Sequence, residues 1–346
     1  MLTAPMELRN GTERMSGRIV PTSTAVMHDA AARLRAGKLV AFPTETVYGL
    51  GADADNADAV RAIFAAKGRP ADHPVIVHVV DVAAIAAWAR DVPASAHRLA
   101  AAFWPGPLTM ILPRAPGVLD VVTGGQDSVG LRVPSHPAAR ALLQAFVQRG
   151  GRGIAAPSAN RFGRISPTTA AHVEDDLGDR VDLIVDGGPC EVGIESTIVA
   201  FLGADAVLLR PGGIAIDAIV RVLGHAPSVP DTAAPRASGT LESHYAPRTP
   251  ARTVMSAALP YEAAKAQGRI AVLARTADAP AGFSGQWLRA SRDPVAYAHD
   301  LYANLRTLDA VGAHEILIEA VPTSDAWLAI VDRITRAVHA EDGDTA

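Results

Sequence analysis

The sequence predicts an α/β protein with one large mixed domain followed by a smaller one. Between residues 24 and 223, short apolar runs typical of strands alternate with segments whose apolar residues recur at helical spacing. A stretch rich in Pro, Ala, Ser and Thr follows, and a second alternation of strand and helix patterns comes after it. The chain has 346 residues, which suits two domains, and 49% of them are hydrophobic, enough for a buried core.

The large domain is predicted to span residues 24–224, after a polar leader at 1–23 that we expect to be loosely ordered. A helix is predicted to end near residue 36, because Gly37 is a common helix stop, and a second helix is predicted at 58–66. Eight strands are predicted, at 39–42, 75–80, 108–112, 129–133, 153–156, 183–185, 197–201 and 206–209. So many strands with helices among them indicate a mixed α/β domain.

The small domain is predicted at residues 251–340, after a linker at 225–250. Strands are predicted at 270–274 and 315–321, and helices at 295–308 and 326–340. This alternation indicates a small parallel three-layer domain, Rossmann-like in outline. No G-x-G-x-x-G follows a strand there, so we predict no dinucleotide binding in it.

Charge and cysteine content exclude several classes of function. The formal net charge is −4 and the pI is about 6.3, which excludes a generally basic nucleic-acid coat but leaves a local basic site open. Cys190 is alone, which excludes an internal disulfide and a multi-cysteine zinc site, and with no base beside it we expect it to be structural. The first ten residues hold no apolar run, and none later approaches membrane-spanning length, so we expect a soluble, cytoplasmic protein.

Two segments early in the chain carry polar groups next to strands or helices. Residues 43–51 read Pro-Thr-Glu-Thr-Val-Tyr-Gly-Leu-Gly after a strand; taken alone they favour a turn over a binding site. Lys67 and Arg69 flank a glycine at a helix end, where cations suit the helix dipole and where they could equally hold a phosphate. His78 closes an apolar run, a position where a histidine is more often packed than catalytic.

Three later segments carry charge or helix-capping signals. Arg132 interrupts a strand that otherwise reads as buried, so it needs an anionic partner, either a protein carboxylate or a ligand carboxylate. Ser166 and Pro167 predict the N-cap and first residue of a helix. Its N-terminus beside Ser158 and Asn160 would form an anion site. The third segment combines Gly-Gly-Pro at 187–189 with Glu-Ser-Thr at 195–197 and Arg-Pro-Gly at 210–212.

Taken together, these segments resemble the YrdC/YwlC-like threonylcarbamoyl-AMP synthases. Lys-Gly-Arg-Pro at 67–70 and Ser-Ala-Asn at 158–160 lie between Pro-Thr-Glu-Thr-Val-Tyr-Gly-Leu-Gly at 43–51 and Glu-Ser-Thr-Ile-Val at 195–199, in the family's order. Ser-His-Tyr-Ala-Pro at 243–247 and the C-terminal domain resemble the long, two-domain form. The resemblance covers roughly residues 24–340.

The resemblance implies a fold and a reaction. The catalytic domain would be a large, twisted, open mixed sheet around a positively lined cavity. The enzyme would be a nucleotidyltransferase that makes threonylcarbamoyl-AMP and pyrophosphate from L-threonine, bicarbonate and ATP. The product would serve the N6-threonylcarbamoylation of adenosine 37 in tRNA. Transient contact with a downstream tRNA threonylcarbamoyltransferase is allowed, while neither stable nucleic-acid binding nor membrane binding is expected.

The resemblance also implies site residues. Lys67 and Arg69 would be catalytic. The residues expected to hold L-threonine are Thr46, His78, Arg132, Ala156 and Ser196. The residues expected to hold ATP are Arg69, His73, Ser128, Ser158, Asn160, Ser166, Arg210 and Tyr245, the last from the linker. No residues are assigned to a metal, because no carboxylate cage is visible, and Mg²⁺ is expected to arrive with ATP.

Three departures from the family's pattern and two competing interpretations stand beside this hypothesis. His73 stands where the family usually has asparagine, Phe162 replaces a small polar residue, and the linker reads Ala-Ser-Gly-Thr at 237–240. A tRNA- or double-stranded-RNA-binding module of the same fold would need a basic surface, and this chain is slightly acidic. A carbamoyl-transfer domain of the hydrogenase-maturation type would carry zinc-finger segments, which a single cysteine excludes.

Overall fold

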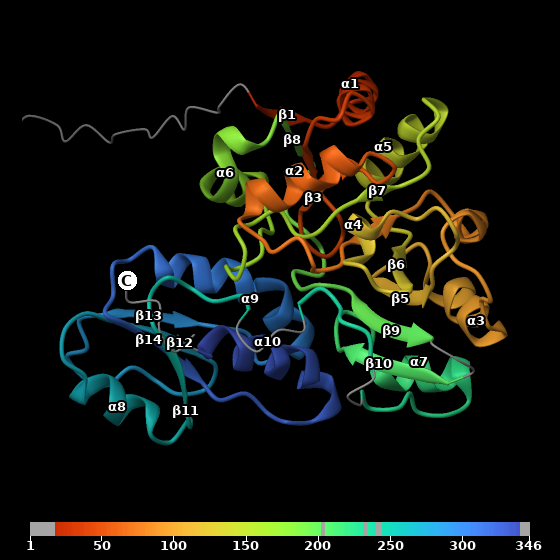
Figure 1. Ribbon diagram of the computed structural model, residues 1–346. Helices are drawn as coiled ribbons and strands as arrows, with labels where there is room; N and C mark the ends of the chain where they lie inside the picture. Colours follow the sequence, from red (N-terminus) through yellow and green to blue (C-terminus); the bar gives the residue numbers. More distant parts are fainter. Residues whose placement is uncertain (1–17, 202–204, 231–233, 240–243, 340–346) are drawn as a thin grey trace, which may run out of the picture.

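The computed structural model describes residues 18–201, 205–230, 234–239 and 244–339 (Figure 1). Its first strand, β1 (Ile19–Pro21), pairs in parallel with β8 (Leu183–Asp186). The predicted leader therefore ends earlier than expected, because the apolar pair Ile19 and Val20 extends the sheet by one edge strand. Residues 1–17 lie outside the described part of the chain.

The large domain is built on a ten-stranded mixed sheet with the order β1-β8-β2-β3-β7-β4-β6-β5-β9-β10. The remaining strands are β2 (Val40–Phe42), β3 (Gly49–Asp53), β4 (Ile76–His78), β5 (Leu108–Pro113), β6 (Ser128–Arg132), β7 (Ile154–Ala155), β9 (Thr197–Phe201) and β10 (Ala206–Arg210). β4 runs parallel to β6, whereas β7 runs antiparallel to β4 and β3. This confirms the predicted mixed sheet.

Helices cover both faces of the large sheet (Figure 1). They are α1 (Thr24–Arg35), α2 (Ala57–Lys67), α3 (Ala94–Phe103), α4 (Asp120–Thr123), α5 (Pro137–Gln148), α6 (Ala170–Leu177) and α7 (Ile216–Leu223), with 3₁₀ turns at Val82–Ala87 and Gly178–Arg180. Successive side chains of a strand point to opposite faces. Accordingly Val40 and Phe42 of β2 join the apolar cluster of α1 and α5, whereas Ala41 joins that of α2 and α3.

Helix boundaries agree with the local signals in one case and disagree in another. Gly37, with φ of +79°, follows α1 as predicted. The predicted helix start at Ser166 is wrong. Helix α6 begins at Ala170, and the hydroxyl of Thr169 caps it by accepting from the backbone N–H of His172 at 3.3 Å. Thr169 has the extended backbone that an N-cap needs, and the Ser166 hydroxyl is used elsewhere, as described below.

The small domain is a four-stranded parallel sheet with helices, as its alternating pattern predicts. Its strands are β11 (Ala251–Val254), β12 (Ile270–Ala274), β13 (Gln286–Arg289) and β14 (Glu315–Glu319), in the order β11-β14-β12-β13. Its helices are α8 (Leu259–Lys265), α9 (Pro294–Asp309) and α10 (Leu328–Val338), with a 3₁₀ turn at Asp325–Trp327. In Figure 1 this domain lies beside the large one, and side chains of α9 and α10 reach across to it.

The described linker residues form isolated β-bridges with the large domain at two places. Ser228 bridges to Val207 of β10, and Ala246 bridges to Arg164. Between them Tyr245 is completely buried, in a left-handed conformation with φ of +63°, which non-glycine residues adopt rarely. Ser243 lies outside the described residues. Among the described helices, none is long and apolar enough to cross a membrane.

Candidate active site

Polar loops at one edge of the large sheet surround a cavity. His78 and Arg132 end the parallel strands β4 and β6 and are direct neighbours in register. Arg210 ends β10, and Ser196 directly precedes β9. The lining residues are Thr44, Thr46, Val47, Gly49, Arg69, Ile76, His78, Arg132, Ala156, Pro157, Ser158, Glu195, Ser196, Arg210, Ser238, Gly239, His244 and Tyr245. Segments 44–49, 156–158 and 195–196 thus meet the linker residues 238–239 and 244–245 only in the folded chain.

Nine of the sequence-predicted site residues line this cavity. They are Thr46, Arg69, His78, Arg132, Ala156, Ser158, Ser196, Arg210 and Tyr245. They include all five residues expected to hold L-threonine. Lys67, His73, Ser128, Asn160 and Ser166 are not among the described residues that line it. The cavity therefore gathers both expected groups, with five exceptions that need separate accounts.

Lys67 lies behind the Ser-Ala-Asn loop instead of facing the cavity. Its ammonium donates to the carbonyl oxygens of Ser158 at 2.6 Å and Asn160 at 2.5 Å. Burial, together with the charge of Arg69, holds the pKa of Lys67 well below its ordinary value. The Asn160 amide donates to the carbonyls of Arg161 and Arg164 at 2.7 and 2.9 Å. Both side chains thus shape the loop that presents Ser158 to the cavity.

The other three exceptions have positions or contacts outside the lining of the cavity. Ser128 begins β6, roughly 13 Å along the strand from Arg132 at the rise of an extended chain. The imidazole of His73 packs edge-on against the ring of Phe162, with 5.5 Å between ring centroids, so two departures from the family's pattern contact each other. Ser166 donates to the carboxylate of Glu195 at 2.6 Å instead of capping a helix.

Two buried arginines of the cavity are held by neutral oxygens. Arg69 donates to the carbonyl of Pro74 at 2.8 Å and to the hydroxyl of Ser238 at 3.3 Å. Arg210 donates to the carbonyls of Ser196 and Ser238, at 2.9 and 2.7 Å. Within the described residues no carboxylate lies in ion-pair contact with either guanidinium. Burial lowers the pKa of Arg69 only to about 10, so it remains positive at neutral pH and suits an anionic ligand.

Arg132 has a protein partner that the sequence reasoning did not identify. Its Nη2 lies 2.8 Å from Oε1 of Glu45, and its Nη1 donates to the hydroxyl of Thr46 at 2.9 Å. Both members of the pair are buried. The charge of Arg132 is therefore already compensated, and its burial alone no longer argues for a ligand carboxylate. Glu45 was visible in the 43–51 motif, but no local pattern pairs it with a strand 87 residues later.

His78 offers unused hydrogen-bonding capacity to the cavity. Both ring nitrogens are buried and have no hydrogen-bond partner among the described residues. Burial, reinforced by the charge of Arg132, keeps the pKa of His78 well below its ordinary value, so the ring is neutral. A neutral imidazole has one donor and one acceptor nitrogen. His78 can therefore bind a polar ligand in either sense.

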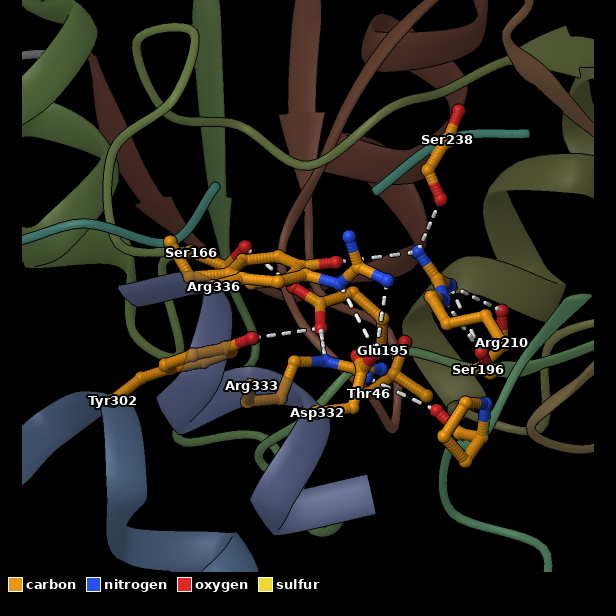
Figure 2. A network of polar contacts seen from close by, with 12 residues as sticks. Thr46, Ser166, Glu195, Ser196, Arg210, Ser238, Tyr302, Asp332, Arg333 and Arg336 are labelled. Carbon is orange, nitrogen blue, oxygen red and sulfur yellow. Dashed lines mark hydrogen bonds and ion pairs between the residues drawn. The ribbon is translucent and has the colours of Figure 1, made fainter. Parts of the chain in front are cut away.

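Glu195 is a cavity residue that the sequence reasoning quoted within a motif but gave no role. Its carboxylate accepts hydrogen bonds from Ser166 at 2.6 Å, from Tyr302 at 2.8 Å and from Nε of Arg333 at 2.7 Å (Figure 2). Burial by itself raises the pKa of Glu195, but the charges of Arg333 and Arg210 outweigh it and bring the pKa to about 2. Glu195 is thus a fixed anion and cannot serve as a base at neutral pH.

Comparisons with known proteins agree over most of the chain. The family described as "Telomere recombination" matches residues 32–212, and the one described as "Threonylcarbamoyl-AMP synthase, C-terminal domain" matches residues 214–338. A threonylcarbamoyl-AMP synthase of Pyrococcus abyssi is 39% identical over 331 residues, covering 89% of this chain and 92% of that protein. One of Bacillus subtilis is 40% identical over 332 residues, covering 91% and 94%.

A solved structure extends the agreement to three dimensions. The crystal structure of P. abyssi Sua5 complexed with L-threonine matches with a TM-score of 0.85 at 35% identity, covering 92% of this chain and 97% of that one. Sequence identity, domain order and fold therefore point the same way. The chain belongs to the threonylcarbamoyl-AMP synthase family.

Proposed function

We propose that this protein joins L-threonine, bicarbonate and ATP to make threonylcarbamoyl-AMP and pyrophosphate, acting as a nucleotidyltransferase for tRNA modification. One observation carries the proposal. A single cavity holds Arg69 and Arg210, neither of them in ion-pair contact with a carboxylate among the described residues, together with a neutral histidine and the Arg132–Glu45 pair. Family membership over nearly the whole chain makes this combination a synthase site, in preference to an RNA-binding surface.

The proposed reaction has two steps, and neither needs a covalent enzyme intermediate. The neutral amine of threonine attacks the carbon of carbon dioxide and loses a proton to solvent, or attacks bicarbonate, whose C–OH bond breaks with loss of water; either route forms a carbamate. A carbamate oxygen then attacks the α-phosphorus of ATP, and the bond to the bridging oxygen of pyrophosphate breaks. The work of the protein is to align anions that repel one another and to neutralise the leaving group.

Under this proposal the cavity has an amino-acid side and a nucleotide side. Thr46, His78 and Arg132 face the amino acid, and Arg69 and Arg210 face the phosphates. We further propose that Mg²⁺ arrives as MgATP, held by the oxygens of the triphosphate. Lys67, assigned as catalytic from sequence, is better proposed to position the Ser158 loop, given its two carbonyl contacts.

The first test is the substrate requirement. Release of pyrophosphate from ATP should depend on L-threonine and bicarbonate together, because the carbamate forms only from both. Serine should react more slowly, since a missing methyl group costs about 1–3 kcal/mol of discrimination. A coupled pyrophosphate assay with each component omitted in turn measures this. Equal release without bicarbonate, or equal release with serine, would contradict the proposed substrates.

The linker is proposed to act as a lid over the nucleotide. Ser238, Gly239, His244 and Tyr245 line the cavity, whose volume of about 40 Å³ has room for only a few water molecules. The Tyr245 hydroxyl lies 3.5 Å from Nη1 of Arg210. We therefore expect the linker to move when ATP enters, and its return would exclude water from the product, a mixed anhydride that water destroys.

Tyr245→Phe tests the lid with the ring retained. We expect a shorter lifetime of threonylcarbamoyl-AMP in the enzyme mixture, because a less firmly held ring admits water, whereas Tyr261→Phe, at an exposed tyrosine of α8, should leave the lifetime unchanged. Cleavage of residues 225–250 by trypsin should also slow when ATP and threonine are added. Cleavage independent of ligands, with an unchanged product lifetime, would reduce the linker to a connector.

A further inference from the structure

The wall of the cavity contains a buried carboxylate that is neutralised from the other domain. Glu195 belongs to the loop before β9 of the large domain, and its side chain is only slightly exposed. Two of its three hydrogen-bond donors, Tyr302 and Arg333, come from α9 and α10 of the small domain. Both are completely buried. Figure 2 shows Glu195 between these two side chains and the cavity arginine Arg210.

This arrangement matters because of what the cavity has to accept. ATP carries several negative charges, and a bare carboxylate in a buried wall would repel it strongly at low local dielectric. The guanidinium of Arg333 compensates that negative charge through its 2.7 Å ion pair with Glu195. Arg333 is in turn fixed by Asp332 at 2.6 Å and by the carbonyl of Pro211 at 3.1 Å.

Arg333 also contacts the linker residue that is proposed to cover the nucleotide. Its guanidinium carbon lies 5.2 Å from the centroid of the Tyr245 ring, within the range of a cation–π contact. The ring of Tyr302 packs against the ring of Tyr245, with 5.6 Å between the two ring centroids. One cation from the small domain therefore touches both the acidic wall and the linker.

We infer that Arg333 and Tyr302 are positioning residues for the nucleotide, through which the C-terminal domain completes the ATP site by neutralising and orienting Glu195. The inference rests on the proposed function for its substrate, and it assigns the small domain a role in the reaction. It also explains how a buried carboxylate can lie in the wall of this cavity. An acidic wall residue beside a phosphate site is tolerable only where a partner of opposite charge is built in, and the large domain alone offers Glu195 no cation in ion-pair contact among the described residues.

The chain contains a matched control for this contact. Arg306 of α9 also crosses from the small domain and pairs with a buried carboxylate of the large one, Asp176 of α6, at 2.6 Å. Asp176 does not line the cavity. Arg306→Gln and Arg333→Gln therefore break comparable contacts between the domains, but only Arg333→Gln removes the ion-pair partner of a carboxylate that lines the cavity.

The experiment compares the Michaelis constants of these full-length variants in pyrophosphate release, with ATP affinity measured by calorimetry. Arg333→Gln should raise KM for ATP roughly tenfold or more and change KM for threonine far less, since loss of one partner of a buried charge pair has effects on this scale. Glu195→Gln combined with Arg333→Gln should restore KM for ATP to within about threefold of the wild type, because the cavity wall then holds no carboxylate without an ion-pair partner. Arg306→Gln should leave both constants unchanged.

The outcomes separate the inference from alternatives. An unchanged ATP affinity in folded Arg333→Gln, or an equal loss of affinity in Arg306→Gln, would overturn the inference. The Arg333–Glu195 contact would then only hold the two domains together. Should Arg333→Gln not fold, Tyr302→Phe keeps the ring and removes one donor to Glu195; we expect KM for ATP to rise by roughly threefold, and no rise would overturn the inference. A wild-type protein that releases no pyrophosphate would instead refute the proposed function, and calorimetric ATP binding would still decide the role of Arg333.

Discussion

Arg69→Ala should reduce pyrophosphate release by a factor of roughly 10²–10³, the scale on which loss of one preorganised charge affects a reaction that develops negative charge. The guanidinium is almost fully buried, lines the cavity and is held by a carbonyl and a hydroxyl, with no carboxylate in ion-pair contact among the described residues. Its Nε has no hydrogen-bond partner there either. Such a cation is available to a phosphate.

Two further variants make this result interpretable. Arg61→Ala, on α2 only eight residues earlier, removes an exposed arginine whose ion pair with Asp58 should contribute less than about 1 kcal/mol to stability, and turnover should stay normal. Arg69→Lys keeps the charge without the planar fork and should retain only part of the activity. Steady-state pyrophosphate assays at saturating ATP and threonine measure all three. Near-normal turnover in Arg69→Ala would mean that Arg69 only complements the helix dipole at the end of α2 and takes no part in the reaction.

Arg132→Met should destabilise the fold by about 3–5 kcal/mol, because it leaves the carboxylate of Glu45 buried without its partner. Denaturant unfolding at neutral pH measures this loss. Glu45→Gln combined with Arg132→Met should recover most of it, since a buried ion pair can be replaced by neutral side chains of similar size at little cost. Equal stability of the single variant and the wild type would contradict the importance of the pair.

The pH dependence of stability provides a second test of the Glu45–Arg132 pair. Burial by itself raises the pKa of Glu45, but the charge of Arg132 outweighs it and lowers that pKa below the ordinary 4.5. In the wild type the stabilisation from Glu45 is thus fully present above pH 4.5 and is lost as the pH falls through the folded-state pKa. In Arg132→Met the counter-charge is gone and burial is opposed only by backbone hydrogen bonds to Glu45, so we expect a higher pKa than in the wild type, and protonation in acid relieves the destabilisation. The stability difference between the two should shrink as the pH is lowered from 7 towards 4.

The double variant also isolates the proposed role of Arg132 towards threonine. It is expected to be folded and to lack the guanidinium, so its KM for threonine reports the ligand contact without a folding defect. We expect that KM to rise far more than the KM for ATP. A loss confined to ATP would place Arg132 on the nucleotide side of the cavity instead.

Local patterns in the sequence predicted most of the elements that surround the cavity. Continuous apolar runs identified strands such as β5 and β9, because a strand buried on both faces needs apolar residues throughout. Strand β3 was missed because Gly49 and Gly51 interrupt its pattern. A Cβ at Gly51 would lie only 2.9 Å from Phe42 and 3.0 Å from Ile154, and one at Gly49 would lie 3.3 Å from Ala156. The half-exposed β13 was missed because it has no continuous apolar run.

The sequence by itself determined the fold class and the two-domain order, because these depend on residue types at short spacing. Its motifs resembled a family, and that resemblance implied nine of the residues that line the cavity. Tertiary structure alone decided the pairing of charges. Glu45 neutralises Arg132, Lys67 serves the backbone of the Ser158 loop, and Arg333 neutralises Glu195 from 138 residues away. A motif records that a charge is present, but its partner is set by the path of the chain, since a buried charge is stabilised by whatever counter-charge or carbonyl the packed elements place within about 3 Å.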